Sequence, residues 1–150
     1  MPTVTFLPLI VAEALPDPAH VISIRDDYTE MGWKVEHKSI LTLRFDDIEG
    51  YMGPEYRNFD YLDALKILSF VRDTNGDDIV VHCHAGVSRS AAVAKFLSEK
   101  MGYELRYHPL GSKSTDRYNR EVYRTLEIAH YDRVVKQSSI IQPPTKGIIQ

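Results

Sequence analysis

One stretch near the middle of this chain constrains its fold more than any other. An apolar run, Ile79–Val81, precedes the segment His82-Cys83-His84-Ala85-Gly86-Val87-Ser88-Arg89-Ser90, and an alanine-rich run, Ala91–Leu97, follows it. The first run is typical of a buried strand, the second of a helix, and the segment between them of a tight loop. A strand that leads into a helix in this way indicates an α/β fold with a mostly parallel sheet. The loop then lies at the carboxyl end of a central strand, where such sheets place ligands.

The residue types in this loop suit a tetrahedral oxyanion. A helix N-terminus and the N–H groups of a loop together form a concave anion site. Arg89 can hold two phosphate oxygens at once with its guanidinium. The same positive field favours the thiolate of Cys83, the only cysteine of the chain, and so makes it a nucleophile. Gly86 is expected where the loop needs a conformation or a close approach that a side chain would block.

The string His82-Cys83-x-x-Gly86-x-Ser88-Arg89-Ser90 resembles the signature of the cysteine-dependent protein tyrosine phosphatases, and within them the compact dual-specificity branch. The resemblance is close over residues 79–92 and looser over the rest of residues 1–133. It implies a hydrolase of phosphate monoesters with a phosphocysteine intermediate, in which Cys83 attacks phosphorus and Arg89 binds its oxygens. It also implies a four- or five-stranded sheet flanked by helices. The backbone that would hold the phosphate passes through His84, Ala85, Gly86, Val87, Ser88 and Arg89.

The resemblance assigns supporting roles as well. Ser90 would donate to the thiolate and ease its departure in the second step, although it could also satisfy its own helix backbone. His82 would hold loop carbonyls and position the cysteine without taking its proton. Asn119 resembles the asparagine that braces the phosphate loop of the family. Because Tyr118 stands where the family has proline, a plain asparagine at a helix start is the alternative.

Cleavage of a phosphate ester by a thiolate also needs an acid for the leaving oxygen. The family supplies it from an aspartate after a strand of the form apolar-x-apolar-x-Asp, which here is Leu43-Arg44-Phe45-Asp46-Asp47. Matching residue by residue puts the general acid at Asp47, with Asp46 in the variable position. The doublet leaves Asp46 open as the acid, and a pair of solvated loop carboxylates is the structural alternative.

Along the chain, turn residues and apolar periodicity predict a single domain over residues 1–136 and a C-terminal tail over residues 137–150. We expect strands at residues 4–7 (an edge strand), 21–24, 35–37, 40–45 and 79–82. We expect one helical turn at residues 11–15, and helices over residues 55–73 and 89–101, the latter closed by Gly102 as a left-handed cap. A last helix is expected to start at a cap formed by Thr115 or Asp116.

Charge and cysteine content limit the classes of partner and the location that we expect for this protein. The 150 residues carry a net charge of −3 and no basic block, which argues against nucleic acid and an anionic membrane. The single cysteine excludes an intrachain disulfide and favours a reducing, cytoplasmic location. The apolar start lacks a basic region, so we expect no targeting segment there. We expect a monomer that acts on a phosphorylated protein or a small phosphomonoester.

Several alternative functions fit the residues of this loop less well. His82 and His84 flank Cys83, but strand alternation and the lack of a second ligand cluster argue against zinc, so no metal or organic cofactor is expected. A phosphoinositide or RNA 5′-phosphatase would need more positive charge than residues 84, 85 and 87 supply. A sulfur-transfer enzyme would not need the Gly86-x-x-Arg89 spacing. A non-catalytic phosphate-binding module would not need the combination of cysteine, arginine and aspartate.

Overall fold

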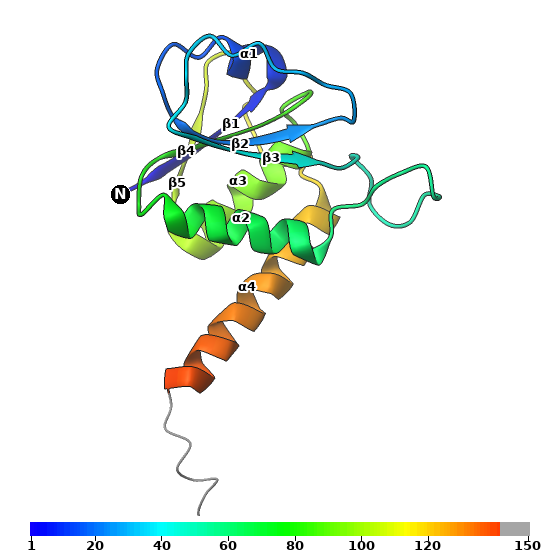
Figure 1. Ribbon diagram of the computed structural model, residues 1–150, viewed down its shortest axis with the longest axis vertical. Helices are drawn as coiled ribbons and strands as arrows, with labels where there is room; N and C mark the ends of the chain where they lie inside the picture. Colours follow the sequence, from blue (N-terminus) through cyan, green and yellow to red (C-terminus); the bar gives the residue numbers. More distant parts are fainter. Residues whose placement is uncertain (142–150) are drawn as a thin grey trace, which may run out of the picture.

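The computed structural model describes residues 1–141 and consists of one five-stranded parallel sheet with helices on both faces (Figure 1). The strand order is β3-β2-β4-β1-β5, and every pairing is parallel. The α/β class and the parallel sheet predicted from the sequence are therefore confirmed. The strands are β1 (Thr3–Pro8), β2 (His20–Arg25), β3 (Ser39–Arg44), β4 (Ile79–Cys83) and β5 (Glu104–Tyr107), and the helices are α1 (Leu9–Glu13), α2 (Tyr61–Asp73), α3 (Arg89–Met101) and α4 (Arg120–Ile141).

The main hydrophobic core lies between the sheet and the layer formed by α2, α3 and α4. Figure 1 shows these helices on one face of the sheet, and α1 with the coil that follows it on the other. Phe6 and Val81 of the sheet and Phe96, Leu97 and Leu126 of the helices are almost completely buried in this core. Burial of side chains of this size is the main stabilising contribution, at about 1.5–3 kcal/mol for each.

The central strand, loop and helix form as the sequence predicts. β4 is the middle strand of the sheet, and α3 begins at Arg89 and ends at Met101. Gly102 follows α3 in the left-handed conformation, with φ of 80°. The small side chains Ala91, Ala92 and Ala94 are fully buried, so α3 packs closely against β1 and β4. This packing positions the N-terminus of α3 beside the end of β4.

The sheet edges differ from the prediction. The first strand was expected at an edge, but β1 lies between β4 and β5. The edge beside β1 is formed by β5, which the sequence pattern did not predict because it has a single aliphatic residue, Leu105, and is mostly exposed. The strand expected over residues 35–37 is absent. That segment instead bonds to the chain around α1 and β2, where Lys38 N donates to the Ala19 carbonyl and His37 Nδ1 accepts from Ala19 N.

The helix boundaries also differ at two places. α2 begins at Tyr61 rather than near residue 55, because Asp60 and Asp63 form a reciprocal capping box there. α4 begins at Arg120 rather than at a cap formed by Thr115 or Asp116. Its cap is Asn119, whose Oδ1 accepts from Val122 N at 3.0 Å.

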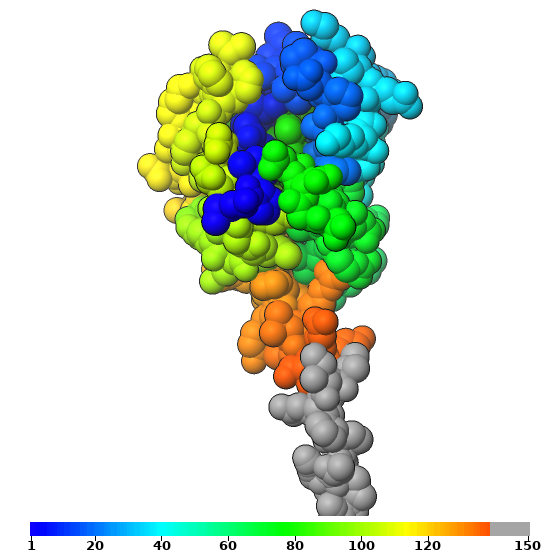
Figure 2. Space-filling model, turned by 90° about the vertical axis from the view of Figure 1, so that its left-hand side faces the viewer, coloured from blue at the N-terminus to red at the C-terminus, as the bar shows by residue number. Residues whose placement is uncertain are grey.

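The domain was expected to end at residue 136, but α4 continues beyond that residue to Ile141. Figure 2 shows its last described turns projecting from the body as a narrow stalk. The rest of the predicted tail, residues 142–150, lies outside the described residues. Neither α4 nor another helix within residues 1–141 is long and apolar enough to cross a membrane.

Candidate active site

Cys83 ends the central strand, and its thiol lies at the base of the loop that follows. Sγ accepts a hydrogen bond from Gly86 N at 3.2 Å and lies 3.1 Å from the Ser90 hydroxyl. The residue is only 2% exposed. The backbone N–H groups of His84, Ala85, Val87 and Ser88 donate to no acceptor within residues 1–141. The loop therefore surrounds the thiol with N–H groups that are free to bind an anion.

The conformation of the loop depends on Gly86. Its φ is +71°, and a Cβ there would lie 2.3 Å from Pro8 N and 2.6 Å from the Leu7 carbonyl carbon. The junction of β1 and α1 therefore packs directly against the loop. Leu9 N also donates to the His84 carbonyl at 3.1 Å. Both the positive φ and the close backbone contact require glycine at this position.

We expect Gly86→Ala to destabilise the protein more than Gly76→Ala. Both glycines have a positive φ, but a Cβ at Gly76 would meet no atom within 4 Å. Gly76→Ala should therefore cost only the left-handed conformation, about 1–2 kcal/mol. Gly86→Ala adds a clash with backbone that cannot move aside. Urea unfolding of both variants measures the difference, and equal losses would show that the close contact with Pro8 is unimportant.

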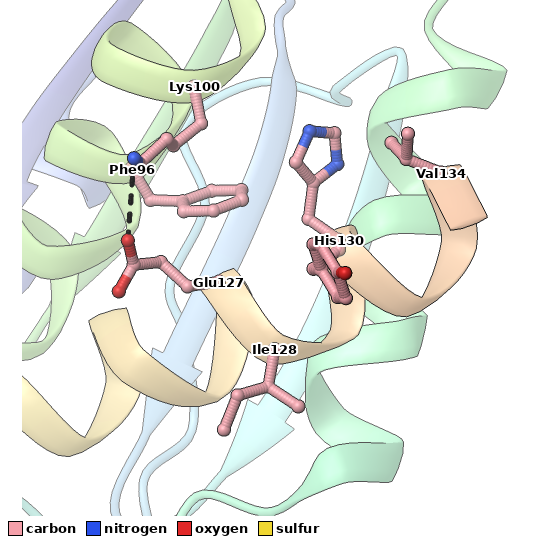
Figure 3. A pocket seen from close by; sticks show the side chains of 7 residues that line it. Phe96, Lys100, Glu127, Ile128, His130 and Val134 are labelled. Atoms are coloured by element: carbon pink, nitrogen blue, oxygen red, sulfur yellow. Dashed lines mark ion pairs between the residues drawn. The ribbon is translucent and has the colours of Figure 1, made fainter.

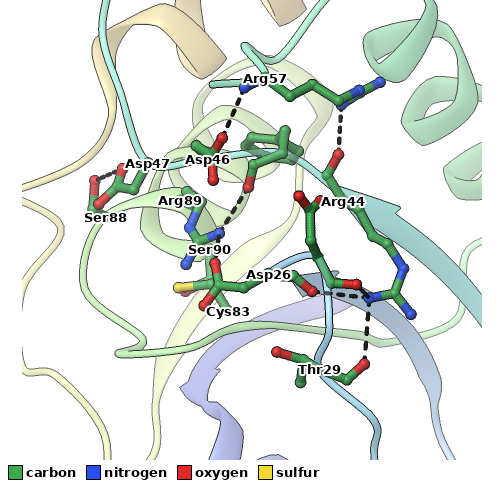
Figure 4. A network of polar contacts seen from close by, with 12 residues as sticks. Asp26, Thr29, Arg44, Asp46, Asp47, Arg57, Cys83, Ser88, Arg89 and Ser90 are labelled. Atoms are coloured by element: carbon green, nitrogen blue, oxygen red, sulfur yellow. Dashed lines mark hydrogen bonds and ion pairs between the residues drawn. The ribbon is translucent and has the colours of Figure 1, made fainter. Parts of the chain in front are cut away.

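Arg89 is buried, with 6% exposure, and one edge of its guanidinium is anchored. Nη1 donates to Asp26 Oδ1 at 2.9 Å and to the Phe45 carbonyl at 2.8 Å (Figure 4). Nε and Nη2 donate to no group within residues 1–141. These atoms form the parallel donor pair of an arginine, which matches two oxygens of a phosphate. The anchored Nη1 leaves that pair available to a ligand.

Asp26 was not among the residues predicted for the site. It directly follows β2, whose carboxyl end lies at the same edge of the sheet as that of β4. The signal in the sequence was an aspartate placed directly after a buried strand. Arg44 holds this segment, because its Nη1 donates to the carbonyls of Asp26 at 2.8 Å and Asp27 at 2.9 Å. Arg57 in turn donates to the Arg44 carbonyl at 2.6 Å, so a chain of arginine contacts positions Arg89.

His82, in β4, contacts the backbone at the start of the cysteine loop. It is fully buried, and its Nδ1 lies 3.2 Å from the Cys83 carbonyl. A carbonyl only accepts, so Nδ1 carries the proton. Nε2 lies 2.6 Å from the Ser23 hydroxyl, and Ser23 Oγ accepts from Arg25 Nε at 2.9 Å. Burial lowers the pKa of His82 to about 4, so the ring is neutral and Nε2 accepts from Ser23.

The low pKa of His82 predicts a pH-dependent stability. The unfolded histidine protonates near pH 6.5 and the folded one only near pH 4, so the unfolded state binds more protons between these values. The contribution of His82 to the free energy of unfolding should be fully present above pH 6.5 and should fall by about 3 kcal/mol as the pH drops to 4. Unfolding by urea at several pH values measures this slope. His82→Gln should remove it and His84→Gln, at an exposed position, should retain it; a slope unchanged in His82→Gln would contradict the assignment.

The two aspartates after β3 point in different directions. Asp47 Oδ1 accepts from Ser88 Oγ at 2.7 Å and from Asn119 Nδ2 at 2.9 Å. Asp46 Oδ2 instead accepts from Arg57 N at 2.7 Å, on the side of the loop before α2 (Figure 4). Asp47, the residue that the sequence comparison preferred as the general acid, is therefore the carboxylate that contacts the cysteine loop. Its Oδ2 makes no hydrogen bond within residues 1–141 and is free to carry a proton.

Asn119 connects three parts of the site. Its backbone N–H donates to the Ser88 carbonyl at 3.1 Å, and its side chain donates to Asp47 and to the Ile48 carbonyl. It also caps α4. Asn119 therefore makes both a contact with the cysteine loop and a helix cap. Asn119 and Ser88 together fix Asp47 relative to the cysteine loop.

The remaining predicted residues line the loop. His84 and Ala85 are exposed, Val87 and Ser88 are half-buried, and Ser90 is fully buried beside the thiol. Within residues 1–141 no group of three or more His, Cys, Asp or Glu side chains is arranged to hold a metal ion. The loop side chains thus leave its N–H groups and Arg89 as the groups available to an anion.

A separate apolar hollow of about 450 Å³ lies between α3 and α4, and none of the predicted site residues lines it. Phe96, Ile128 and Val134 contribute apolar side chains, and Lys100 forms an ion pair with Glu127 at 3.4 Å (Figure 3). His130 and Tyr131 also line it. Cys83, Arg89 and Asp47 lie elsewhere, at the carboxyl edge of the sheet.

Comparisons with known proteins gave no match to a family model, to a curated protein or to a solved structure. The function is accordingly inferred from the residues of the site and their geometry.

Proposed function

We propose that this protein is a cysteine-dependent phosphatase that hydrolyses phosphate monoesters, of the kind that the dual-specificity phosphatases exemplify. One observation carries the proposal. The Cys83 thiol accepts a hydrogen bond from Gly86 N at the base of a loop, and the N–H groups of His84, Ala85, Val87 and Ser88 and the Nε–Nη2 edge of Arg89 make no hydrogen bond within residues 1–141. A nucleophile surrounded by donors in this way suits attack on a phosphoryl group, whose oxygens carry the charge.

In the first step the Cys83 thiolate attacks phosphorus in line with the leaving oxygen. Arg89 and the loop N–H groups hold the three equatorial oxygens and stabilise their charge in the transition state. The S–P bond forms as the P–O bond to the leaving group breaks. The proton on Asp47 Oδ2 passes to the leaving oxygen, because Oδ1 is already engaged by Ser88 and Asn119.

In the second step water attacks the phosphocysteine. Asp47, now ionised, takes a proton from the water, and the S–P bond breaks as the new P–O bond forms. The Ser90 hydroxyl, 3.1 Å from Sγ, donates to the departing thiolate. Inorganic phosphate leaves, and the thiolate is restored without any metal or organic cofactor.

We propose phosphotyrosine as a substrate, with phosphoserine and phosphothreonine as further substrates, and a monomeric enzyme in the cytoplasm. A reducing compartment keeps the single Cys83 reduced, as attack on phosphorus requires. Phosphoinositides and RNA 5′-phosphates are less suitable, because residues 84, 85 and 87 are His, Ala and Val and supply no lysine around the phosphate.

The test is hydrolysis of a simple aryl phosphate at neutral pH. We expect turnover that vanadate and tungstate inhibit competitively, since both are tetrahedral oxyanions like phosphate. EDTA should have no effect, because the thiolate and Arg89 need no metal. Absence of turnover together with tight phosphate binding would contradict the enzyme and favour a phosphate-binding module. Loss of activity on chelation, restored by zinc, would contradict the mechanism.

A further inference from the structure

We propose that a polar hollow beside the cysteine loop binds a second anionic group on the substrate, and that the preferred substrates are phosphopeptides with acidic residues next to the phosphorylated side chain. The proposal deepens the function proposed above and rests on it. The residues that would carry this preference are Arg117 and Arg120. Neither lies in the cysteine loop.

The hollow borders the proposed reaction site and shares two residues with it, Asp47 and Ser88. Its volume is about 370 Å³, and it is lined by Asp47, Glu49, Ser88, Arg117, Tyr118, Asn119 and Arg120. Ser88 belongs to the cysteine loop, and Asp47 is the carboxylate that faces that loop. A molecule with its phosphate in the loop therefore has the hollow directly beside it.

The cations of the hollow are available to a ligand. Arg117 and Arg120 are both exposed, and neither forms an ion pair with a carboxylate within residues 1–141. The Arg120 guanidinium lies 5.6 Å from the centre of the Tyr118 ring, which orients it. The N-terminus of α4 adds partial positive charge at the same place.

The carboxylates of the hollow are already engaged. Asp47 accepts from Ser88 and Asn119, and Glu49 Oε2 accepts from Arg120 N at 2.5 Å at the start of α4. Each carboxylate is thus bound by neutral donors, and neither forms an ion pair with Arg117 or Arg120. A ligand anion can then bind Arg117 and Arg120 without displacing an existing ion pair.

The chemistry places the leaving group on this side. Asp47 must protonate the leaving oxygen, so that oxygen has to approach Asp47 Oδ2. The group attached to the oxygen therefore passes the wall of the hollow that Asp47 forms. An anionic side chain near the phosphorylated residue then comes within reach of Arg117 and Arg120.

A peptide fits this distribution of charge better than a polyphosphorylated headgroup. A ring with several phosphates presents charge on many sides, but the loop positions His84, Ala85 and Val87 supply no fixed cation. Arg117 and Arg120 lie on one side only, which suits a chain with an acidic residue at one place along it. We therefore commit to an acidic phosphopeptide.

The experiment compares two phosphotyrosine peptides that differ only in their flanking residues, glutamate in one and glutamine in the other. With the wild-type protein we expect kcat/KM to be about five- to tenfold higher for the glutamate peptide, the effect of two exposed ion pairs. The ratio should fall towards one at 1 M salt. In the double variant Arg117→Gln/Arg120→Gln the ratio should be close to one at low salt as well.

The matched control is Arg72→Gln, which removes an exposed arginine at the carboxyl end of α2. This end leads into the start of β4 and so lies at the opposite edge of the sheet from the hollow. The control should retain the wild-type ratio. If Arg72→Gln lowers the ratio as much as the double variant does, net charge explains the preference and the hollow does not.

The outcomes separate this inference from the proposed function. Hydrolysis of both peptides with equal kcat/KM by the wild type would overturn the acidic preference and leave the phosphatase in place. Failure to hydrolyse either peptide or an aryl phosphate would overturn both. Faster hydrolysis of a soluble inositol polyphosphate than of the glutamate peptide, lost in the double variant, would overturn the choice of a peptide as the substrate.

Discussion

Replacement of Cys83 by serine is expected to abolish turnover and to leave oxyanion binding intact. Within residues 1–141, the only groups that hydrogen-bond to Cys83 Sγ are Gly86 N–H and the Ser90 hydroxyl, and neither is a base that could activate a serine. The rate should therefore fall at least about a thousandfold. The free N–H groups of the loop and the Arg89 donor pair remain, so tungstate should still bind.

Two measurements check this result. Hydrolysis of an aryl phosphate gives the rate, and thermal unfolding with and without tungstate gives the binding. A Cys83→Ser variant with more than a few per cent of the wild-type rate would contradict the cysteine mechanism. A variant that is inactive but no longer stabilised by tungstate would mean that the substitution has disrupted the loop itself, and Cys83→Ala then serves as the second variant.

Replacement of Asp47 by asparagine is expected to have an effect that depends on the leaving group. A general acid matters most when the leaving oxygen departs poorly without a proton. Asp47→Asn should lower the rate on a phosphotyrosine peptide by about 10²–10⁴. On an aryl phosphate with an acidic phenol the loss should be much smaller. Asparagine can still accept from Ser88 and Asn119 through its carbonyl oxygen, so the fold of the site is retained.

Asp46→Asn is the matched control. Asp46 is adjacent in the chain, but its carboxylate accepts from Arg57 N and lies on the other side of the loop. We expect little change in rate on either substrate. A leaving-group-dependent loss in Asp46→Asn, and none in Asp47→Asn, would mean that the assignment is wrong by one residue. If neither variant shows it, the acid comes from another loop.

Much of the candidate site could be predicted because its residues are close together in the chain. Cys83, Gly86, Arg89 and Ser90 lie within a few residues of one another, so spacing alone brings them together once a strand, a loop and a helix form. Local apolar periodicity was enough to predict β4 and the bounds of α3. Gly86 was predicted for a conformation or a close approach that excludes a side chain, and the structure shows both, although only the tertiary structure identifies Pro8 as the neighbour.

The elements with weak local signals were the ones predicted wrongly. β5 is short and mostly exposed, and within residues 1–141 it pairs only with β1, roughly a hundred residues earlier in the chain. The start of α4 was placed too early because Thr115 and Asp116 are acceptable caps, whereas the contacts of Asn119 with Ser88, Asp47 and Ile48 decide the actual boundary. Such contacts join distant segments and leave no periodic pattern.

By itself the sequence determined a parallel α/β fold with a central strand, a cysteine-containing loop and a helix, because short-range spacing and hydrophobic burial specify them. Only the tertiary structure decided what surrounds that loop. The anchoring of Arg89 by Asp26 and the turning of Asp47 rather than Asp46 towards Ser88 depend on strands that meet at one sheet edge. Pairing of parallel strands brings their carboxyl ends together across large separations in sequence, and the resulting contacts follow from packing rather than from local pattern.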